Sequence, residues 1–488
     1  MARLTPNGTT GERREAPAGR GRAPLLLAMT PAVSALCGAF LCALSCALVA
    51  PQARAGVPDT FGLGARSSAM AGAVGADATD FSAGYYNPAG LAFADGISLS
   101  AGYAYFTQQL LTNGADNGVE AVHGLGAGAV VPGRIGGVPV AFGVTLHLPD
   151  DGLSYLKARR QEAPRWELYD TRQQLLFLAA NLAVRPLPWL AVGGGIGYLS
   201  ATRGSFGIRG RAELVRPFDS ALEHTVDAEL TAVRFPLAGV RAKMPGLGAL
   251  AVTYRGKSQL DLALDARLEG IVDFAGIEVP LLYALEARTK SSFTPEQLSL
   301  AMSVQRIAHL TLDLELAYVA WSGYESPTAQ IVAELDVDAP PGTPVELPAK
   351  PAPTKVLPPG FRDRLVPRLG AEWRVALGPR DREVHGERVP LFEALVRAGY
   401  AFEASPVPEQ RGSTSYLDAD RHVVTFGAGL ALHRVSAELP GTARLDVHGL
   451  VALLPERATV KASPADLTGD YRVSGTQVGG GAALSVDF

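Results

Sequence analysis

One loop of the sequence carries residue types that suit ligand binding. Its four cations and a neighbouring tryptophan, all within residues 148–172, are Lys157, Arg159, Arg160, Arg165 and Trp166. Guanidinium groups bind carboxylates through paired hydrogen bonds, and apolar side chains bind a hydrocarbon tail. The loop is therefore a candidate for capturing an amphiphilic carboxylate. The stronger alternative is that these cations contact anionic lipopolysaccharide on the outside of a cell.

Motifs that carry catalysis or bind metals are absent from the rest of the chain. After residue 55 there is no H-E-x-x-H, no G-x-S-x-G and no C-x-x-C pattern. Gly256-Lys257-Ser258 resembles the end of a phosphate-binding loop, but Ala251 stands where that motif needs its leading glycine. We therefore expect no catalytic residue, no metal site and no cofactor. An outer-membrane enzyme whose serine and histidine meet only in three dimensions stays open as an alternative.

The charge balance excludes nucleic acid as a partner. The 44 Lys and Arg residues are outnumbered by 48 Asp and Glu residues, which gives a net charge of −4. A nucleic-acid-binding surface needs a basic field, and this composition supplies none. No shift in composition divides the chain into separate compact domains, so we expect one large folded unit.

The first 55 residues have the organisation of a secretory signal. Basic residues up to Arg22 precede an uncharged apolar run from Ala23 to Ala50, and the small-x-small sequence Ala53-Arg54-Ala55 follows. These are the n-region, h-region and cleavage site of a signal peptide, with cleavage expected after Ala55. A single membrane anchor is the alternative, because the run is long enough to span a bilayer. All three cysteines lie in this region, so the exported chain would have none.

The remainder alternates apolar and polar residues with a period of two. In Thr311–Tyr318, the leucines at 312, 314 and 316 share one face with Tyr318, while Asp313 and Glu315 lie on the other. Such segments of about ten residues are typical of strands that cross an outer membrane, although a soluble sandwich also alternates. The candidate strands are 97–108, 122–131, 138–147, 173–184, 189–200, 231–242, 249–268, 285–304, 311–321, 363–375, 393–403, 421–432, 443–454 and 476–488.

The number and spacing of these segments predict a closed barrel. There are about 14, an even number as single-chain outer-membrane barrels require, and a break at Ser258 or Pro295 would raise it. The connections alternate long and short, as expected for large outer loops and tight periplasmic turns. The gap 376–392 departs from this rule, because it should be short. We therefore predict an all-β fold, a transmembrane antiparallel β-barrel formed by residues 97–488.

Residues 56–96 show neither the alternation of a strand nor the apolar stripe of a helix. This stretch is rich in Gly, Ala and Ser and contains Asn87-Pro88-Ala89-Gly90. Small residues allow close backbone packing, and Pro88 fixes a bend and restricts Asn87. We interpret the stretch as a hatch, a plug inside the barrel lumen. A flexible linker is the alternative.

The chain ends as outer-membrane barrels do. Leu484, Val486 and the terminal Phe488 lie on one face of a last predicted strand. An aromatic carboxy-terminus of this form predicts recognition by the outer-membrane assembly machinery.

Four tracts in sequence order resemble the FadL/TodX family of outer-membrane channels for hydrophobic compounds. The first resembles that family's hatch with its Asn-Pro-Ala motif, and the others resemble its recurrent strand and turn sequences. The tracts are Gly72-Ala73 through Asp77 with Asn87-Pro88-Ala89; Leu250-Ala251-Val252-Thr253-Tyr254-Arg255; Thr294-Pro295-Glu296 with Leu316-Ala317-Tyr318-Val319-Ala320-Trp321-Ser322; and Ser405-Pro406-Val407-Pro408 with Asp418-Ala419-Asp420-Arg421.

The resemblance implies a monomeric barrel of 14 strands with an internal hatch that includes Asn87, Pro88 and Ala89. It implies passive uptake of long-chain fatty acids or aromatic hydrocarbons across the outer membrane of a Gram-negative bacterium, with membrane lipid and lipopolysaccharide as neighbours. Long-chain fatty acid is the favoured substrate. An aromatic hydrocarbon channel and a structural or adhesive barrel without transport are the alternatives.

Overall fold

The computed structural model describes the chain from residue 58 onward with several gaps. The described ranges are 58–150, 163–170, 176–213, 221–274, 277–327, 330–337, 356–412, 414–434, 441–461 and 468–488. The expected signal peptide, residues 1–55, therefore lies outside the described residues, as do Lys157, Arg159 and Arg160.

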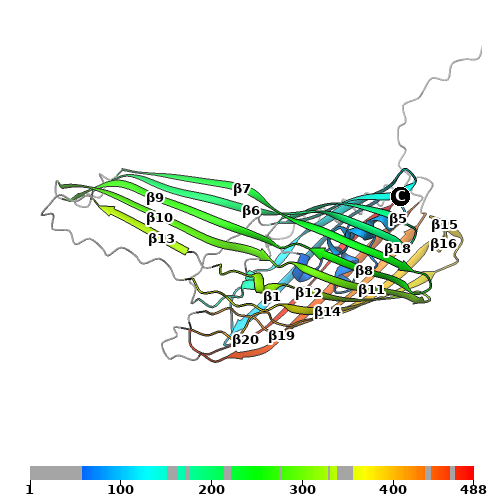
Figure 1. Ribbon diagram of the computed structural model, residues 1–488. Helices are drawn as coiled ribbons and strands as arrows, with labels where there is room; N and C mark the ends of the chain where they lie inside the picture. Colours follow the sequence, from blue (N-terminus) through cyan, green and yellow to red (C-terminus); the bar gives the residue numbers. More distant parts are fainter. Residues whose placement is uncertain are drawn as a thin grey trace, which may run out of the picture. The chain divides into compact units, whose positions relative to one another are not determined.

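Fourteen strands close into one antiparallel ring. The ring closes because β1 pairs with β3 along one edge and with β20 along the other, where Ser98 lies opposite Asp487. The predicted β-barrel is thereby confirmed (Figure 1). The strands in ring order are β1 (Ser98–Thr112), β3 (Val122–Ile135), β4 (Val138–Pro149), β5 (Phe177–Leu187), β6 (Leu190–Glu213), β7 (Ala221–Met244), β8 (Gly248–Arg255), β11 (Gln297–Ile307), β12 (Leu310–Val319), β14 (Arg364–Leu377), β17 (Phe392–Glu403), β18 (Arg421–His433), β19 (Thr442–Thr459) and β20 (Tyr471–Asp487).

The two long strands predicted at 249–268 and 285–304 are wrong as single strands. The first breaks between Arg255 and Ser258, and the second breaks between Thr294 and Gln297. Pro295 has no N–H to donate to a strand ladder, which explains the second break. The number of strands in the ring nevertheless stays at 14, because β8 pairs directly with β11.

Three additional strands, two of them between these breaks, extend the sheet beyond the 14-strand ring. Strand β9 (Ser258–Phe274) forms a hairpin with β10 (Ile277–Thr294), and β13 (Gln330–Val337) pairs with β10. Strand β9 also runs parallel to the distal part of β6, with Phe206 opposite Ala266. Figure 1 shows β9, β10 and β13 beside the long β6 and β7. The region 322–362, which separates two of the predicted barrel strands, thus contains a strand.

Three smaller strands lie outside the ring. The short β2 (Ala115–Asp116) pairs with the end of β1. The gap at 376–392, which was too long for a tight turn, contains a two-stranded hairpin formed by β15 (Arg382–Val384) and β16 (Glu387–Val389). A small folded unit in this connection accounts for its length.

The wall has its apolar face outside and its polar face inside. In β12, Leu314, Leu316 and Tyr318 are 43%, 44% and 43% exposed, whereas Asp313 and Glu315 are 1% and 6% exposed. A soluble sandwich would bury the leucines and expose the carboxylates. The arrangement is that of a barrel that meets lipid with its outer surface.

The helices are short. They are α2 (Pro58–Phe61), α3 (Ala65–Ala69), α4 (Ala83–Tyr86), the 3₁₀ helices η1 (Pro88–Phe93) and η3 (Trp321–Gly323), and α5 (Glu167–Asp170). In the described part of the chain, none of the helices has the length and apolar character needed to cross a membrane.

Candidate functional site

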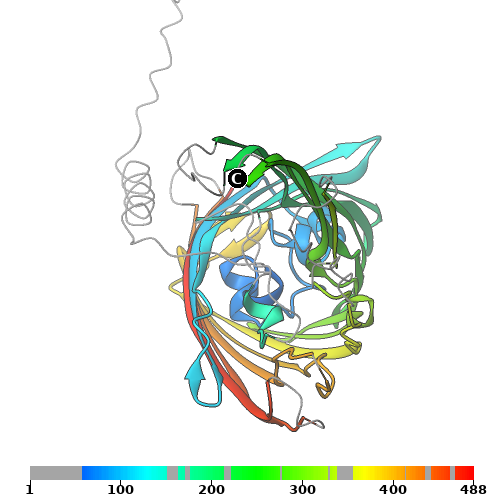
Figure 2. The same ribbon diagram turned by 90° about the vertical axis from the view of Figure 1, so that its left-hand side faces the viewer.

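The N-terminal segment, residues 58–96, lies within the ring of strands. Figure 2 shows its blue helices surrounded by the wall. The segment contacts opposite parts of the wall: Thr145 of β4 donates to the carbonyl of Phe81 (2.7 Å), and Thr425 of β18 donates to the carbonyl of Ala69 (2.8 Å). Because its small residues allow the backbone to approach the wall, the segment occupies the lumen with only short helices of its own.

Asn87 joins two parts of this segment to the wall. Its fully buried side chain donates from Nδ2 to the carbonyls of Gly75 (2.9 Å) and Val240 (3.3 Å). Its Oδ1 accepts a hydrogen bond from the backbone N–H of Ala89 at 3.1 Å and so caps η1, which begins at Pro88. One side chain therefore sets the start of a helix and links it to β7.

Two wall glycines make this contact possible. A Cβ atom at Gly239 would lie 2.0 Å from the Asn87 Oδ1, and one at Gly193 would lie 2.4 Å from the carbonyl carbon of Pro88. Both separations are far below van der Waals contact. Within the segment, Gly90 has the same role, since its Cβ would lie 2.1 Å from the Ala78 carbonyl oxygen.

A chain of buried ion pairs forms a second link between the segment and the wall. Arg66 pairs with Asp77 within the segment and with Glu372 of β14 at 2.9 Å. Glu372 also accepts from Arg397 of β17 (2.7 Å), which in turn pairs with Asp446 of β19 (2.6 Å). Paired charges thus connect the N-terminal segment to β14 and, through β14, to β17 and β19.

The ion pairs also govern the protonation of Asp77. Burial alone would raise the pKa of this carboxyl group, but the guanidinium groups of Arg66 and Arg241 outweigh that effect and lower its pKa below the ordinary value. Asp77 is therefore ionised at neutral pH, and the electrostatic link to Arg66 is intact there.

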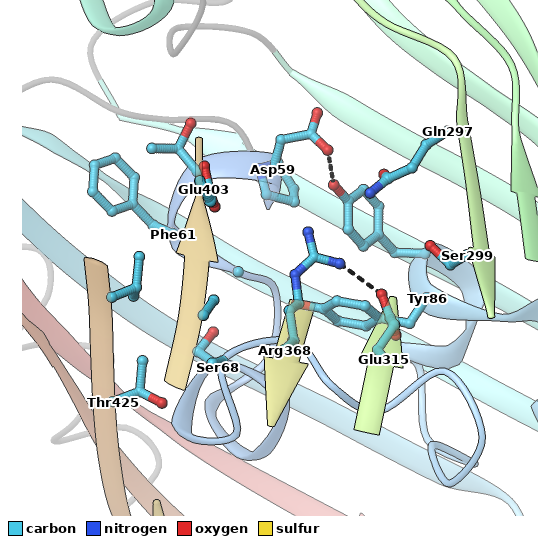
Figure 3. Close-up of a pocket in the computed structure, with 18 of the residues that line it drawn as sticks. Asp59, Phe61, Ser68, Tyr86, Gln297, Ser299, Glu315, Arg368, Glu403 and Thr425 are labelled. Atoms are coloured by element: carbon cyan, nitrogen blue, oxygen red, sulfur yellow. Dashed lines mark hydrogen bonds and ion pairs between the residues drawn. The ribbon is translucent and has the colours of Figure 1, made fainter. Parts of the chain in front are cut away.

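A first cavity, of about 60 Å³, lies between the segment and the wall (Figure 3). Its charged residues form three opposite pairs, so the cavity offers a bound carboxylate no surplus of positive charge. The pairs are Arg255 with Asp59 (2.7 Å), Arg368 with Glu315 (2.6 Å) and Arg421 with Glu403 (3.2 Å).

A second cavity, of about 50 Å³, shares Phe61, Gly62 and Ser68 with the first. Its lining is different, because no Asp, Glu, Lys or Arg is among the described residues around it. Seven of its lining residues carry an aromatic or imidazole ring. The residues with rings are Phe61, Phe81, Tyr103, Phe106, His123, His147 and His448.

An aromatic cap joins the connections at the end of the ring where β12 and β17 finish. Its buried rings belong to Trp166, Tyr169, Phe293, Trp321, Tyr324, Phe361 and Tyr416. The rings are in direct contact: Tyr324 and Phe361 are stacked with centroids 4.6 Å apart. The cap therefore packs residues from five separate parts of the sequence.

Arg165 and Trp166 of the predicted capture loop belong to this cap. They are only 3% and 1% exposed. The backbone of Arg165 hydrogen-bonds to Ser415 (3.1 Å) and Leu417 (2.8 Å), and its guanidinium carbon lies 5.3 Å from the centre of the Tyr416 ring. In this structure both residues hold the cap together and neither is displayed at the surface.

Asp418 lies beneath the cap in the connection between β17 and β18. Its carboxylate accepts hydrogen bonds from the hydroxyls of Ser405 (2.6 Å) and Tyr169 (3.4 Å). Burial raises the pKa of Asp418 to about 6. This connection therefore contains a carboxyl group that titrates in mildly acidic solution.

The three residues of the predicted assembly signal lie at the seam that closes the ring. Leu484 and Val486 of β20 pair with Ala101 and Leu99 of β1. Phe488 donates its backbone N–H to the Ile97 carbonyl at 2.8 Å, and its side chain is 45% exposed.

The sequence did not reveal the ion-pair link. Charged residues at 368, 372 and 374 alternate with apolar ones, which predicts an inward position, but nothing local indicates that Glu372 meets Arg66. The two residues are 306 positions apart. Such pairs become visible only when the ring is closed around the segment.

Comparison with solved structures finds the same architecture in known channels. The chain is similar to a Pseudomonas aeruginosa FadL homologue, with a TM-score of 0.54 and 16% identity over 87% of this chain and 98% of that one. It is also similar to the TodX deltaS2S3 mutant monoaromatic hydrocarbon channel, with a TM-score of 0.50 and 15% identity over 88% and 100% of the two chains. No family model and no curated protein matches the sequence. At these identities the likeness establishes a shared fold.

Proposed function

We propose that the protein is an outer-membrane channel for passive uptake of hydrophobic compounds, with the N-terminal segment as its hatch. The observation that carries this proposal is a lumen filled by a segment that hydrogen bonds and ion pairs attach to the surrounding strands. Asn87 holds it to β7 and Arg66 holds it to β14. A filled lumen blocks free diffusion of ions, whereas a displaceable segment lets a bound compound pass.

The apolar outer wall supports the location. A closed barrel satisfies all strand hydrogen bonds internally, and its outward leucines suit a lipid environment. The ring closes within one chain, so we propose a monomer in the outer membrane of a Gram-negative bacterium, exported by its N-terminal signal. The position of Phe488 on the last strand supports assembly by the outer-membrane machinery.

Long-chain fatty acids are the first substrate class we propose, on the basis of the four sequence tracts. Neutral aromatic compounds are a second class, which the second cavity favours, because three phenylalanine rings and no described charged residue line it. Apolar molecules cross a hydrated sugar layer poorly, and a dry binding pocket lowers that barrier.

Uptake measurements test the proposal. Gram-negative cells that lack their own channels of this kind should take up labelled oleate or toluene faster when they express the full-length protein. A channel-free control strain and a strain with another barrel of similar abundance set the baseline. Equal uptake of every fatty acid and aromatic compound in all three strains would favour a structural or adhesive barrel.

A further inference from the structure

The imidazole of His448 has no hydrogen-bond partner, and it lies in a cavity that no Asp, Glu, Lys or Arg lines among the described residues. His448 is on β19, opposite Gly427 of β18 and Gly481 of β20, and it lines the second cavity. Both ring nitrogens are buried and make no hydrogen bond. Buried polar atoms without partners are rare and costly, so such an atom indicates a missing ligand or water.

The wall leaves space for this ring. A Cβ atom at Gly481 would lie 2.8 Å from the Cε1 atom of His448, so a larger residue there would displace the imidazole. The ring of Phe106 lies near the imidazole, with the centroids 6.1 Å apart. Phe106 in turn stacks on Phe61 of the N-terminal segment, with centroids 4.5 Å apart. The imidazole therefore lies beside a pair of stacked rings that the segment completes.

The composition of the cavity restricts its ligand. A neutral imidazole offers one N–H donor and one acceptor nitrogen. An anionic ligand finds no described Lys or Arg in the lining, and a pure hydrocarbon leaves both nitrogens without partners. A neutral aromatic hydroxyl compound needs no cation and gives the imidazole a partner. Its ring packs against phenylalanine, and its O–H pairs with the imidazole.

We propose that the second cavity binds neutral phenols, with the hydroxyl group of the ligand hydrogen-bonded to His448. This inference rests on the proposed channel function and specifies a compound class for one of its cavities. The hatch supplies Phe61 and Phe81 to the same cavity, so a bound phenol contacts both the hatch and the wall.

Equilibrium dialysis of the purified full-length protein in detergent tests the proposal. Labelled phenol, toluene and benzoate are compared at neutral pH, and dialysis against detergent alone corrects for partition into micelles. We expect measurable binding of phenol and toluene and weaker binding of benzoate. His448→Leu should weaken phenol binding about fivefold, the effect of one hydrogen bond, and leave toluene binding unchanged or tighter.

Two further variants separate hydrogen bonding from packing. His448→Gln, which keeps a donor and an acceptor, should retain most of the preference for phenol. His422→Leu is the control and should behave as wild type. His422 is on β18 and does not line the cavity, and its Nδ1 lies 2.9 Å from the Tyr400 hydroxyl. If His448→Leu does not fold, judged by heat-modified migration on gels, His448→Ala replaces it.

The outcomes distinguish this inference from the channel function. Equal loss of phenol and toluene binding in His448→Leu would mean that the histidine only fills space, and would overturn the inference. Toluene binding without any preference for phenol would also overturn it and leave the channel function intact. The channel function itself would be contradicted if the protein bound no hydrophobic ligand and cells that express it took up these compounds no faster than the control strains.

Discussion

Arg66 of the N-terminal segment lies 2.9 Å from the carboxylate of Glu372 on the barrel wall, and the two side chains are only 10% and 0% exposed. The pair joins a segment near the start of the chain to the middle of β14. Since Glu372 also binds Arg397, removing Arg66 leaves the rest of the network in place. This geometry makes Arg66 the point at which hatch attachment can be tested with least damage to the barrel.

Arg66→Met should loosen the hatch. Removing one partner of a buried ion pair costs about 3–5 kcal/mol, because the remaining charges lose compensation. We expect higher and noisier ionic current through the purified protein in planar bilayers. Arg411→Met is the control, because Arg411 is 75% exposed and pairs only with an exposed glutamate. A current equal to wild type in the Arg66 variant would show that this pair does not hold the hatch.

Gly239→Ala should displace Asn87 from the wall. The added Cβ would lie 2.0 Å from the Asn87 Oδ1, so the segment must shift before the barrel can close around it. Limited proteolysis should cut the segment faster than in wild type. Gly133→Ala is the matched control, since its nearest neighbour would be 3.9 Å away. Identical proteolysis of the two variants would contradict the contact.

Trp166→Ala should open the aromatic cap. The side chain is 1% exposed, and replacing a buried tryptophan by alanine costs about 3–5 kcal/mol. We expect a lower thermal unfolding midpoint and faster cleavage of the connection that contains Tyr416. Trp373→Ala, at a position 60% exposed on the outer wall, should leave cap cleavage unchanged. A stable cap in Trp166→Ala would mean that the other rings suffice.

Asp418 should make the cap region less stable as the pH rises. Its pKa is raised to about 6 in the folded protein, so between the ordinary value and 6 the folded state holds a proton that the unfolded state has lost. Stability from this group is therefore greatest below about pH 4 and falls by roughly 3 kcal/mol in total as the pH rises from about 4 through 6.

Hydrogen exchange of residues 404–412 and 414–420 at pH 4.5 and 7.5, corrected for intrinsic rates, measures this effect. Asp418→Asn should abolish the difference, because asparagine does not ionise, whereas Asp381→Asn at an exposed site should preserve it. The same pH dependence in the Asp418 variant would assign the effect to another group.

The sequence predicted the wall better than its connections. Alternation at 311–318 is a local signal, and it gave the correct facing of Leu314 and Glu315 because a strand has only two faces. The direct pairing of β8 with β11 could not be predicted, because strand pairing over 40 residues depends on contacts that local periodicity does not record. Pro295 was the one local signal that the strand predicted at 285–304 is interrupted.

The candidate site was also predictable only where the sequence signal is local. Asn87 and its glycine-rich surroundings were identifiable because few residue types tolerate such close packing. The sequence could not identify the partner of Arg66, nor the lack of a hydrogen-bond partner at His448. Each depends on residues that only ring closure brings together. The four capture-loop cations were singled out from composition, yet Arg165 lies in the cap, because an apolar neighbourhood can bury a guanidinium that stacks on an aromatic ring.

The most direct test of the account is to lock the hatch to the wall. A Cβ at Gly75 would lie 3.2 Å from the Cβ of Ala301 on β11, slightly closer than the roughly 3.5–4.5 Å of disulfide-bonded residues, and no native cysteine follows residue 46. Uptake of labelled oleate and toluene is measured in cells that express the Gly75→Cys, Ala301→Cys double variant, before and after reduction. The account predicts that uptake is lost when the bond is formed and returns when it is reduced. Full uptake with the bond quantitatively formed would contradict a moving hatch.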